Sequence, residues 1–291
     1  MRDVVYLNGS LMPPSQARVS VFDHGFLYGY GLFETMRAYN GRIFLLERHL
    51  NRLLEAASVL GLAGLNAAEL DKACMDTLAA NGLKSARLRL TVSRGEAGSL
   101  TGTCHKPTIL VTASSYSPPP PEKYDRGFRA GLASFRRCSQ SPIVRFKSTS
   151  YLVSVMARME AEAAGLDESL FLNEQGHITE GSTSNIFLVT SPCRLVTPPI
   201  ESGLLAGITR QVVLELAGSL GLNTIEAEVR LKDLEQASEA FLTSSLIEIM
   251  PLVGVRDNTG KVITIGSGKP GPVTRRLMAA YREMVKRETS Q

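Results

Sequence analysis

The chain has 291 residues, more than a single hydrophobic core usually serves, so two domains are expected. Hydrophobic residues make up 44% and charged residues 21%, close to globular averages, which predicts a soluble folded protein. The net charge of +4 comes from 32 basic and 28 acidic residues scattered along the chain, with no basic run that would follow a nucleic-acid backbone. We therefore expect no nucleic-acid partner.

The cysteines and the hydropathy of the sequence indicate the cellular compartment in which the protein is expected. Cys74, Cys104, Cys138 and Cys193 are widely separated and show no C-x-x-C spacing, so neither a zinc site nor a disulfide framework is predicted. This usage fits a reducing cytoplasm. No apolar export signal is visible, and no stretch approaches the roughly 20 apolar residues that a membrane span needs. We expect a cytoplasmic protein with no metal and no membrane partner.

The first part of the chain reads as a small α+β domain over residues 1–117. Asn8-Gly9 and Asn40-Gly41 each separate two apolar runs, which predicts hairpins over Val4–Met12 and Phe33–Leu46. Apolar residues at steps of three and four predict a helix that follows the second hairpin. The other predicted elements are helices over Glu47–Leu60 and Asn66–Asn81 and strands over Arg87–Ser93 and Thr108–Ser114.

A run of prolines separates this unit from a larger one. The segment S-P-P-P-P-E-K at Ser117–Lys123 favours extended backbone and cannot donate to a sheet, which predicts a linker at 118–123. The larger domain then covers 124–291 and mixes strands with helices, so the fold class is α+β. Its predicted strands are Arg129–Phe135, Glu168–Asn173, Ser184–Thr190 and Ala240–Thr243, and its predicted helices are Ser150–Ala164 and Thr209–Leu220.

Lys147 is the first candidate for chemistry. It lies in I-V-R-F-K-S-T-S-Y, after a strand-like run and before a helix that Ser148, Thr149 or Ser150 can cap. A partly desolvated lysine near Arg145 can have a lowered pKa and act as a Schiff-base nucleophile. Most lysines just before helices are solvated surface charges, so the local sequence alone favours that interpretation.

Glu180 lies in T-E-G-S-T-S-N, at Thr179–Asn185, a few residues into the strand that follows the turn N-E-Q-G. Its carboxylate can hydrogen-bond a pyridinium nitrogen, and the short residues after it would let a ring approach closely. An edge-strand glutamate beside a turn is the alternative. The sequence leaves both interpretations open, although Gly-Ser-Thr-Ser has little β propensity and needs a reason to interrupt a strand.

A helix start follows at L-L-A-G-I-T-R, Leu204–Arg210, where free N–H groups and the Thr209 hydroxyl would form a phosphate seat. An ordinary capped helix is the alternative. Thr243-Ser244-Ser245 can add donors or can be a turn. A carboxylate on one segment and a helix N-terminus on the next would hold both poles of an anionic heterocycle, which suggests pyridoxal phosphate.

Read in order, these segments resemble the class IV aminotransferases, the fold type IV family of pyridoxal-phosphate enzymes. The similarity covers nearly the whole chain. It implies a smaller N-terminal α+β domain, a larger C-terminal mixed α/β barrel-like domain and a homodimer in which loops complete the partner's pocket. The segments that carry it are Y-L-N-G, D-H-G-F-L-Y-G-Y-G-L-F-E-T-M-R at Asp23–Arg37, E-R-H-L-N-R-L at Glu47–Leu53, Lys147, T-E-G-S-T-S-N, L-L-A-G-I-T-R and F-L-T-S-S.

The resemblance also implies residue roles. Lys147 would be the catalytic lysine that bonds to the cofactor and moves the α-proton, and Glu180 would pair with the pyridine nitrogen. Leu205 would pack on one face of the ring. An amino acid would leave as a keto acid, and a second keto acid would accept the amino group. The residues implied to hold the phosphate are Arg52, Ile208, Thr209, Ser244 and Ser245.

Departures from the subfamilies bear on specificity. D-amino-acid aminotransferases carry an R-x-H segment where this chain has Ser99-Leu100-Thr101. Branched-chain enzymes carry Y-x-R where this chain has Arg87-Leu88-Arg89, so the arginine position is kept. Tyr28 and Phe33 match aromatic pocket positions of the branched-chain subfamily. The resemblance thus implies substrate contacts from Tyr28, Phe33 and Arg89.

Three functional hypotheses follow. The first is an aminotransferase acting on apolar, branched-chain α-amino acids and 2-oxo acids. The second is a 4-amino-4-deoxychorismate lyase, which uses the same cofactor to release pyruvate and 4-aminobenzoate. The third is a non-catalytic pyridoxal-phosphate carrier, which the joint presence of Lys147, Glu180, Arg52 and Thr209 disfavours. Tyr151 follows Lys147 by four residues rather than five, and Tyr30 stands where the family usually has Asp.

Overall fold

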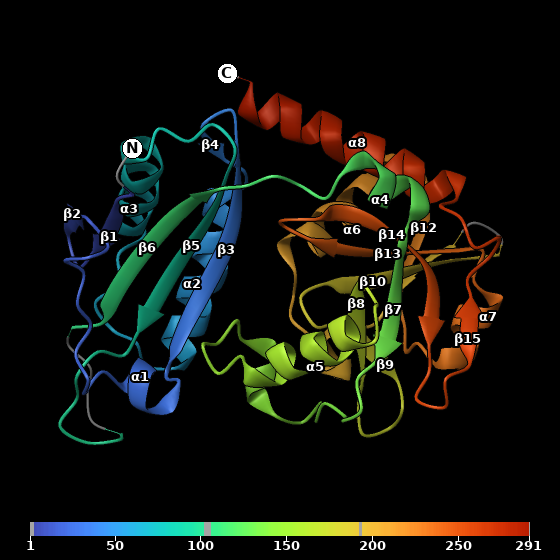
Figure 1. Cartoon of the computed structure of the whole chain (residues 1–291), viewed down its shortest axis with the longest axis horizontal. Coiled ribbons are helices and arrows are strands. Elements are labelled where there is room, and N and C mark those ends of the chain that lie inside the picture. Colours follow the sequence, from blue (N-terminus) through green and yellow to red (C-terminus); the bar gives the residue numbers. More distant parts are fainter. Residues whose placement is uncertain (1–2, 102–105, 192–193, 291) are drawn as a thin grey trace. The chain divides into compact units, whose positions relative to one another are not determined.

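The computed structural model describes residues 3–101, 106–191 and 194–290, and the chain folds as two compact units (Figure 1). Unit 1 comprises residues 1–117, 146–151 and 285–291, and unit 2 comprises residues 118–145 and 152–284. Two segments that the sequence placed in the larger domain, 146–151 and 285–291, thus group with unit 1. One cause is backbone pairing, because the Phe33 N–H donates to the Lys147 carbonyl at 2.8 Å.

Unit 1 is built on a six-stranded sheet in the order β2-β1-β6-β5-β3-β4, in which all pairs are antiparallel. Its core joins this sheet to helices α2 and α3, with Met36, Leu50, Leu53 and Leu88 among the buried side chains. The strands are β1 (Val5–Leu7), β2 (Ser10–Met12), β3 (Gly31–Tyr39), β4 (Arg42–Ile43), β5 (Ala86–Ser93) and β6 (Thr108–Ser115), and the helices are α1 (His24–Tyr28), α2 (Leu46–Val59) and α3 (Ala67–Ala80).

Local sequence explains these elements. Both hairpin turns have positive φ at two successive residues, 47° and 95° at Asn8-Gly9 and 52° and 80° at Asn40-Gly41, as tight turns of this kind require. Helix α3 begins after Asn66, whose side chain accepts from Ala68 N and Glu69 N. The hairpins and the helices predicted for this unit are therefore confirmed, with boundaries shifted by at most three residues.

Unit 2 is a mixed sheet in the order β12-β11-β10-β13-β14-β7-β8-β9, with β15 paired to β14. Strand β7 is parallel to both β8 and β14, and β11 is parallel to β12. The sheet curls around one core that includes Leu170, Ile186, Leu242 and Leu252 (Figure 1). Its strands are β7 (Phe128–Leu132), β8 (Glu168–Leu172), β9 (Ile178–Gly181), β10 (Asn185–Thr190), β11 (Arg194–Thr197), β12 (Asn223–Glu226), β13 (Glu239–Ser244), β14 (Glu248–Arg256) and β15 (Val262–Thr264).

The helices of unit 2 depart from the prediction at the linker. Helix α4 (Pro121–Arg126) begins inside the predicted linker 118–123, because Pro121 stands at the first helical position, where its missing N–H costs nothing. Helices α5 and α6 match the two predicted ones, whereas α7 and α8 were not predicted. The bounds are α5 (Leu152–Ala163), α6 (Ile208–Ser219), α7 (Leu231–Gln236) and α8 (Pro272–Thr289), with short 3₁₀ helices η1 (Pro142–Arg145) and η2 (Ile200–Ser202).

Two broader observations concern the described part of the chain. None of its helices combines the length and the apolar character needed to cross a lipid bilayer. Among the same residues, no three His, Cys, Asp or Glu side chains gather in a way that could hold a metal ion.

Cys74 and Cys138 are free thiols, and burial raises the pKa of Cys74 to about 12. Cys104 and Cys193 lie outside the described residues.

Candidate active site

Lys147 lies beside β3 in unit 1. The predicted strand before it is wrong, because Pro142–Arg145 forms the 3₁₀ helix η1. The segment after it is held by backbone hydrogen bonds instead: Thr149 N donates to Gly31 O at 2.9 Å, and the Thr149 hydroxyl donates to Gly29 O at 2.7 Å. These bonds fix the lysine against the strand that carries Phe33, so the chain needs no regular element of its own there.

Aromatic rings surround the lysine amine. Lys147 Nζ lies 4.7 Å from the centre of the Phe33 ring and 5.9 Å from that of Tyr151. The two rings meet edge to face with centroids 5.2 Å apart. Arg89 lies over the same Phe33 ring, with its guanidinium carbon 3.7 Å from the centroid. Unit 1 therefore brings together the predicted catalytic lysine and two of the three predicted substrate residues, with Tyr151 beside them.

The environment of Arg89 affects its ionisation. Burial lowers the pKa of Arg89, and the neighbouring charge of Arg87 lowers it further, while Tyr151 acts in the opposite direction. The guanidinium also donates from Nε to the Thr91 hydroxyl at 3.2 Å. A partly desolvated cation of this kind is suited to binding a carboxylate.

Arg52, predicted to bind the phosphate, belongs to a buried charged cluster with two residues that sequence reasoning did not single out. Its Nε and Nη2 donate to the two carboxylate oxygens of Glu34, at 2.8 and 2.6 Å. His49, one helical turn earlier on α2, lies with Nδ1 2.7 Å from Glu34 Oε2. Glu34 and His49 are almost completely buried, at 1% and 2% exposure. We call Glu34, His49 and Arg52 the Glu34 cluster.

Titration in the Glu34 cluster follows from burial and charge. Burial alone would raise the pKa of Glu34, but the charges and hydrogen bonds of Arg52 and His49 outweigh it and hold this pKa at about 2. Burial lowers the pKa of His49, and Glu34 only partly offsets that effect. The charges of Arg52 and Lys147 also lower the pKa of His49, so the lysine lies within electrostatic reach of the cluster.

Glu180 lies on β9 in unit 2, as predicted, and is buried. Arg137, a residue that sequence reasoning missed, pairs with its Oε1. Its Oε2 accepts from Asn185 Nδ2 and from the Leu205 backbone N–H, both at 3.2 Å. Asn185 in turn donates to the Leu205 carbonyl at 2.9 Å. The T-E-G-S-T-S-N and L-L-A-G-I-T-R segments are thus joined through Glu180, Asn185 and Leu205.

The hydroxyl residues after Glu180 have a role that their sequence did not reveal. Ser182, Thr183 and Ser184 all donate their hydroxyls to the carboxylate of Glu168, the last two at 3.2 and 2.9 Å. Glu168 also accepts from the backbone N–H groups of Ser182 and of Ser169, the residue that follows Glu168 in the chain. Its side chain is 1% exposed. We call this set the Glu168 cluster. It fixes the turn between β9 and β10, on which Glu180 and Asn185 lie.

The start of α6 suits an anionic group. Gly207 is its N-cap and no side chain caps the helix there. A Cβ at this position would collide with Asn185 Oδ1, so the Asn185 side chain, which donates to the Leu205 carbonyl, would have to shift. Ile208 and Thr209 follow as the first two helical residues and are buried. A helix start without a side-chain cap, with positive dipole and bare backbone, fits a phosphate.

The segment Thr243-Ser244-Ser245 ends β13 and continues into a turn. Thr243 Oγ1 is buried without a hydrogen-bond partner among the described residues. The Ser244 hydroxyl accepts weakly from Ile247 N at 3.5 Å. An orphaned hydroxyl beside two further hydroxyl residues is consistent with a polar ligand in this part of unit 2.

Two tyrosines near α1 differ in exposure. Tyr28, the third predicted substrate residue, is 57% exposed, and its ring meets the edge of the His24 ring. Tyr30 packs against the core of unit 1, and its hydroxyl donates to the Leu60 carbonyl at 2.6 Å. Arg94 lies over its ring at 4.9 Å. The unusual Tyr30 therefore ties β3 to the end of α2.

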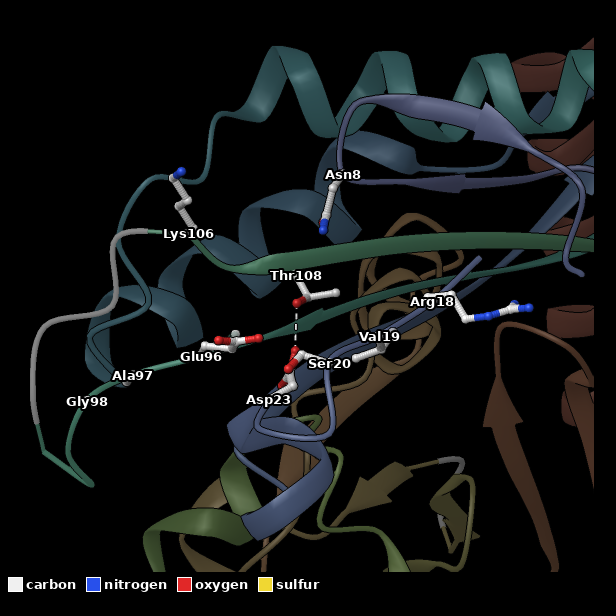
Figure 2. A pocket seen from close by; sticks show the side chains of 11 residues that line it. Asn8, Arg18, Val19, Ser20, Asp23, Glu96, Ala97, Gly98, Lys106 and Thr108 are labelled. Atoms are coloured by element: carbon white, nitrogen blue, oxygen red, sulfur yellow. Dashed lines mark hydrogen bonds between the residues drawn. The ribbon is translucent and has the colours of Figure 1, made fainter. Parts of the chain in front are cut away.

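A separate pocket of about 510 Å³ in unit 1 contains none of the predicted site residues (Figure 2). Its buried carboxylate, Asp23, accepts from the hydroxyls of Ser93 and Thr108 at 2.8 and 2.6 Å and from Gly25 N at 2.6 Å. Figure 2 shows the hydrogen bond between Thr108 and Asp23, both of which line this pocket. Asp23 caps α1 and orders the loop, a structural role.

Comparison with known proteins decides the family. The sequence profile described as amino-transferase class IV matches residues 31–255. The chain belongs to this family. It is 38% identical to a Methanocaldococcus jannaschii protein provisionally named a branched-chain-amino-acid aminotransferase, over 96% of both chains. It is 33% identical to the aminodeoxychorismate lyase of Bacillus subtilis, over 97% of this chain and 95% of that one.

A solved structure agrees with this family. The branched-chain aminotransferase of Thermoproteus uzoniensis with norvaline matches with a TM-score of 0.87 at 34% identity, over 98% of this chain and 95% of that one. The predicted fold type IV architecture and the predicted enzyme class are confirmed. Sequence reasoning did not single out Glu34 and Arg137, which contact the predicted residues Arg52 and Glu180, or Glu168, which holds the turn after Glu180. For Glu34, the signal was a charged residue in the run G-L-F-E-T-M-R, among the apolar residues Leu32, Phe33 and Met36.

Proposed function

We propose that this class IV aminotransferase binds pyridoxal phosphate and moves the amino group between an apolar, branched-chain α-amino acid and a 2-oxo acid. The observation that carries the proposal is the placement of Lys147, whose amine lies against the rings of Phe33 and Tyr151 within reach of the Glu34 cluster. A half-buried lysine that lies beside two aromatic rings is better suited to nucleophilic chemistry than a fully solvated surface lysine.

The cofactor roles rest on the environment of each residue in its own unit. Lys147 would bond to the cofactor aldehyde, and Glu180, buried and ordered by Arg137, Asn185 and the Leu205 amide, would face the pyridine nitrogen. Leu205 would pack on the ring. The phosphate ligands we propose are Arg52, the uncapped start of α6 at Ile208 and Thr209, and the hydroxyls of Ser244 and Ser245.

The chain's own residues supply the remaining chemistry. When bound, pyridoxal phosphate supplies an electron-withdrawing ring that makes the substrate's α-proton acidic. Lys147, displaced by the amino acid, would take up that proton from Cα and deliver it to the carbon that had carried the cofactor aldehyde, which requires an amine that is neutral when it takes up the proton. The Phe33 and Tyr151 rings limit its solvation. The α-carboxylate would bind Arg89, and the apolar substrate side chain would lie against Phe33.

We also propose a cytoplasmic homodimer. Unit 1 exposes apolar side chains around α1, including Phe22 at 67% and Phe26 at 75%, beside the exposed Tyr28. Unit 2 exposes a second set on α5, with Leu152, Val153, Val155, Met156 and Met159. Exposed apolar patches of this kind typically mark interaction surfaces, and a partner copy covering α1 would enclose Tyr28. Sedimentation of the purified protein at several concentrations tests the dimer.

The experiment that tests the function compares two substrates. Rapid absorbance scans of the cofactor-loaded protein with L-leucine and with aminodeoxychorismate are recorded together with pyruvate release. Conversion of the bound cofactor to its amine form by leucine, restored by a 2-oxo acid, is the expected result. No response to leucine or to any other amino acid would contradict it.

Lys147→Ala is expected to abolish both cofactor attachment and turnover, because the variant loses the amine that lies against Phe33. Lys72→Ala, which removes an exposed lysine paired with Asp76 one helical turn away, is the matched control and should keep full activity. Retained turnover in Lys147→Ala would remove the central claim.

The second candidate function is the lyase. It is favoured by the 33% identity to the aminodeoxychorismate lyase of Bacillus subtilis and by the presence of a basic residue at Arg89. Both reactions would use the same lysine, so substitution of Lys147 does not separate them. Release of pyruvate from aminodeoxychorismate without an acceptor, together with silence toward leucine, would replace our proposal with the lyase.

A further inference from the structure

The carboxylate of Glu34 bonds two side chains at once. Oε1 accepts from Arg52 Nε at 2.8 Å, and Oε2 accepts from Arg52 Nη2 at 2.6 Å. Oε2 also lies 2.7 Å from His49 Nδ1. Arg52 and His49 lie three residues apart on α2, while Glu34 lies on β3. One buried carboxylate therefore orients two side chains on the same helix face.

This geometry fixes the state of both partners. The two bonds to Arg52 use the Nε–Nη2 edge, which fixes the plane of the guanidinium and with it the direction of all its N–H groups. An ionised Glu34 can only accept hydrogen bonds, so the proton between Oε2 and Nδ1 belongs to His49. Burial also lowers the pKa of His49, the direction that favours the neutral imidazole with its proton on Nδ1.

We propose that Glu34 is a positioning residue for the cofactor phosphate: its carboxylate fixes the guanidinium of Arg52 in the orientation that binds phosphate and holds His49 as the Nδ1–H tautomer. This inference rests on the proposed function, in which Arg52 is a phosphate ligand. Glu34 itself touches neither cofactor nor substrate and acts through Arg52.

Two observations favour this role over a merely structural one. A buried ion pair adds little net stability compared with apolar residues of similar size, and the neighbours of Glu34 on β3 are otherwise mostly buried and apolar. In addition, the Arg52 side chain is 16% exposed while Glu34 is 1% exposed, so the pair lies at the boundary of the core rather than inside it. A carboxylate at that boundary can hold an arginine for a ligand.

The test separates phosphate recognition from the rest of cofactor binding. Protein stripped of cofactor is titrated with pyridoxal 5'-phosphate and, separately, with pyridoxal, which carries the aldehyde but no phosphate. Absorbance of the cofactor attached to Lys147 gives both dissociation constants. In Glu34→Gln the preference for the phosphorylated form is expected to fall about tenfold or more, because a charge-assisted bidentate contact is lost, while the pyridoxal affinity changes little.

Three variants serve as controls. Glu239→Gln removes another buried carboxylate, which accepts from Val273 N and Thr274 N at the start of α8, and should leave the preference unchanged. Arg52→Lys should lower the preference as Glu34→Gln does. In the Arg52→Lys background, Glu34→Gln should then add less than about threefold, since the two residues act through one contact.

Several outcomes would overturn the proposal. These are equal weakening of both ligands in Glu34→Gln, an unchanged preference, or full additivity with Arg52→Lys. If Glu34→Gln does not fold, Glu34→Asp, which keeps the charge but shortens its reach, must show the same selective loss. Failure of the unaltered protein to attach pyridoxal 5'-phosphate at all would overturn the proposed function and this inference with it, whereas attachment with an unchanged preference would overturn the inference alone.

Discussion

The Glu34 cluster in unit 1 and the Glu168 cluster in unit 2 bury a carboxylate to the same extent, 1% exposure, in opposite ways. Glu34 meets the guanidinium of Arg52 and the imidazole of His49. Glu168 meets three hydroxyls and two backbone N–H groups, with Arg158 no closer than 3.9 Å. The buried charge of Glu34 is therefore compensated mainly by the positive charge of Arg52, and that of Glu168 mainly by neutral hydrogen-bond donors.

The two kinds of partner give the two carboxylates different roles. A carboxylate with a cationic partner fixes the direction of that cation, and its loss leaves a charge uncompensated. A carboxylate with neutral donors fixes the path of the backbone that carries them, and its loss leaves hydroxyls unsatisfied. Glu34 therefore orients a side chain, Arg52, whereas Glu168 shapes the turn that follows Glu180.

The largest effect that separates the two clusters is expected from Glu34→Gln. The substitution leaves Arg52 without its counter-charge and places an amide N–H against N–H donors, so the free energy of unfolding should fall by about 3 kcal/mol. Arg52 reaches solvent at its edge, which keeps the loss at the lower end of the range for buried pairs. Urea titration measures it, and Glu55→Gln, an exposed site on the same helix, should change stability by less than about 0.5 kcal/mol.

The acid dependence of stability should show the same cluster. The pKa of Glu34 is held at about 2 in the folded protein against an ordinary value of 4.5, so its stabilisation is present above pH 4.5 and is lost as the pH falls toward 2. The loss amounts to at most about 3 kcal/mol. The lowered pKa of His49 acts in the same direction below pH 6.5.

Unfolding free energies measured from pH 7 to pH 3 should therefore fall for the unaltered protein and fall less for Glu34→Gln. The same titration on Glu55→Gln should follow the unaltered protein. Parallel curves for Glu34→Gln and the unaltered protein would show that Glu34 does not carry the acid sensitivity.

A smaller effect is expected from Glu168→Gln. The amide keeps one acceptor oxygen, but its NH₂ group faces hydroxyls that had donated to Oε2, and hydroxyls can rotate to accept. We expect a loss of about 1–2 kcal/mol, less than for Glu34→Gln because no charge is stranded. Chemical denaturation measures it, with the exposed Glu201→Gln as control in the same unit. A larger loss of unfolding free energy in Glu168→Gln than in Glu34→Gln would show that the neutral donors matter more to stability than the charged partner.

The contrast between the clusters also shows what the sequence could predict. The spacing of apolar residues and the turn residues were sufficient to predict the hairpins at Asn8-Gly9 and Asn40-Gly41 and the helices α2, α3 and α6, because those signals are local. The order of motifs predicted the family, and the family supplied Lys147, Glu180 and Arg52. The short side chains of Ser182-Thr183-Ser184 were interpreted as leaving room for a cofactor ring. Nothing in the local sequence shows that their hydroxyls donate to Glu168, which lies fourteen or more residues away.

Long-range pairing accounts for the other errors. The run before Lys147 is apolar enough for a strand, yet its backbone forms η1 and the following residues pair with Gly29 and Gly31. Arg137 was missed because its partner, Glu180, lies 43 residues away. A charged residue within an apolar strand, such as Glu34, indicates that an oppositely charged partner lies nearby. The sequence does not identify that partner, because Arg52 and His49 contact Glu34 only when β3 packs against α2.

The smallest predicted effect concerns a half-buried group that carries no charge. Tyr30 donates its hydroxyl to the Leu60 carbonyl at 2.6 Å, where the chain leaves α2. Tyr30→Phe keeps the ring against the core and under Arg94 and removes one neutral hydrogen bond, so it should cost about 1 kcal/mol. Thermal unfolding measures this, and Tyr116→Phe, also in unit 1, is the ring-matched comparison. A loss equal to that of Glu34→Gln would mean that anchoring the end of α2 matters as much as the charge on Glu34, and the distinction between charged and neutral compensation in this fold would fail.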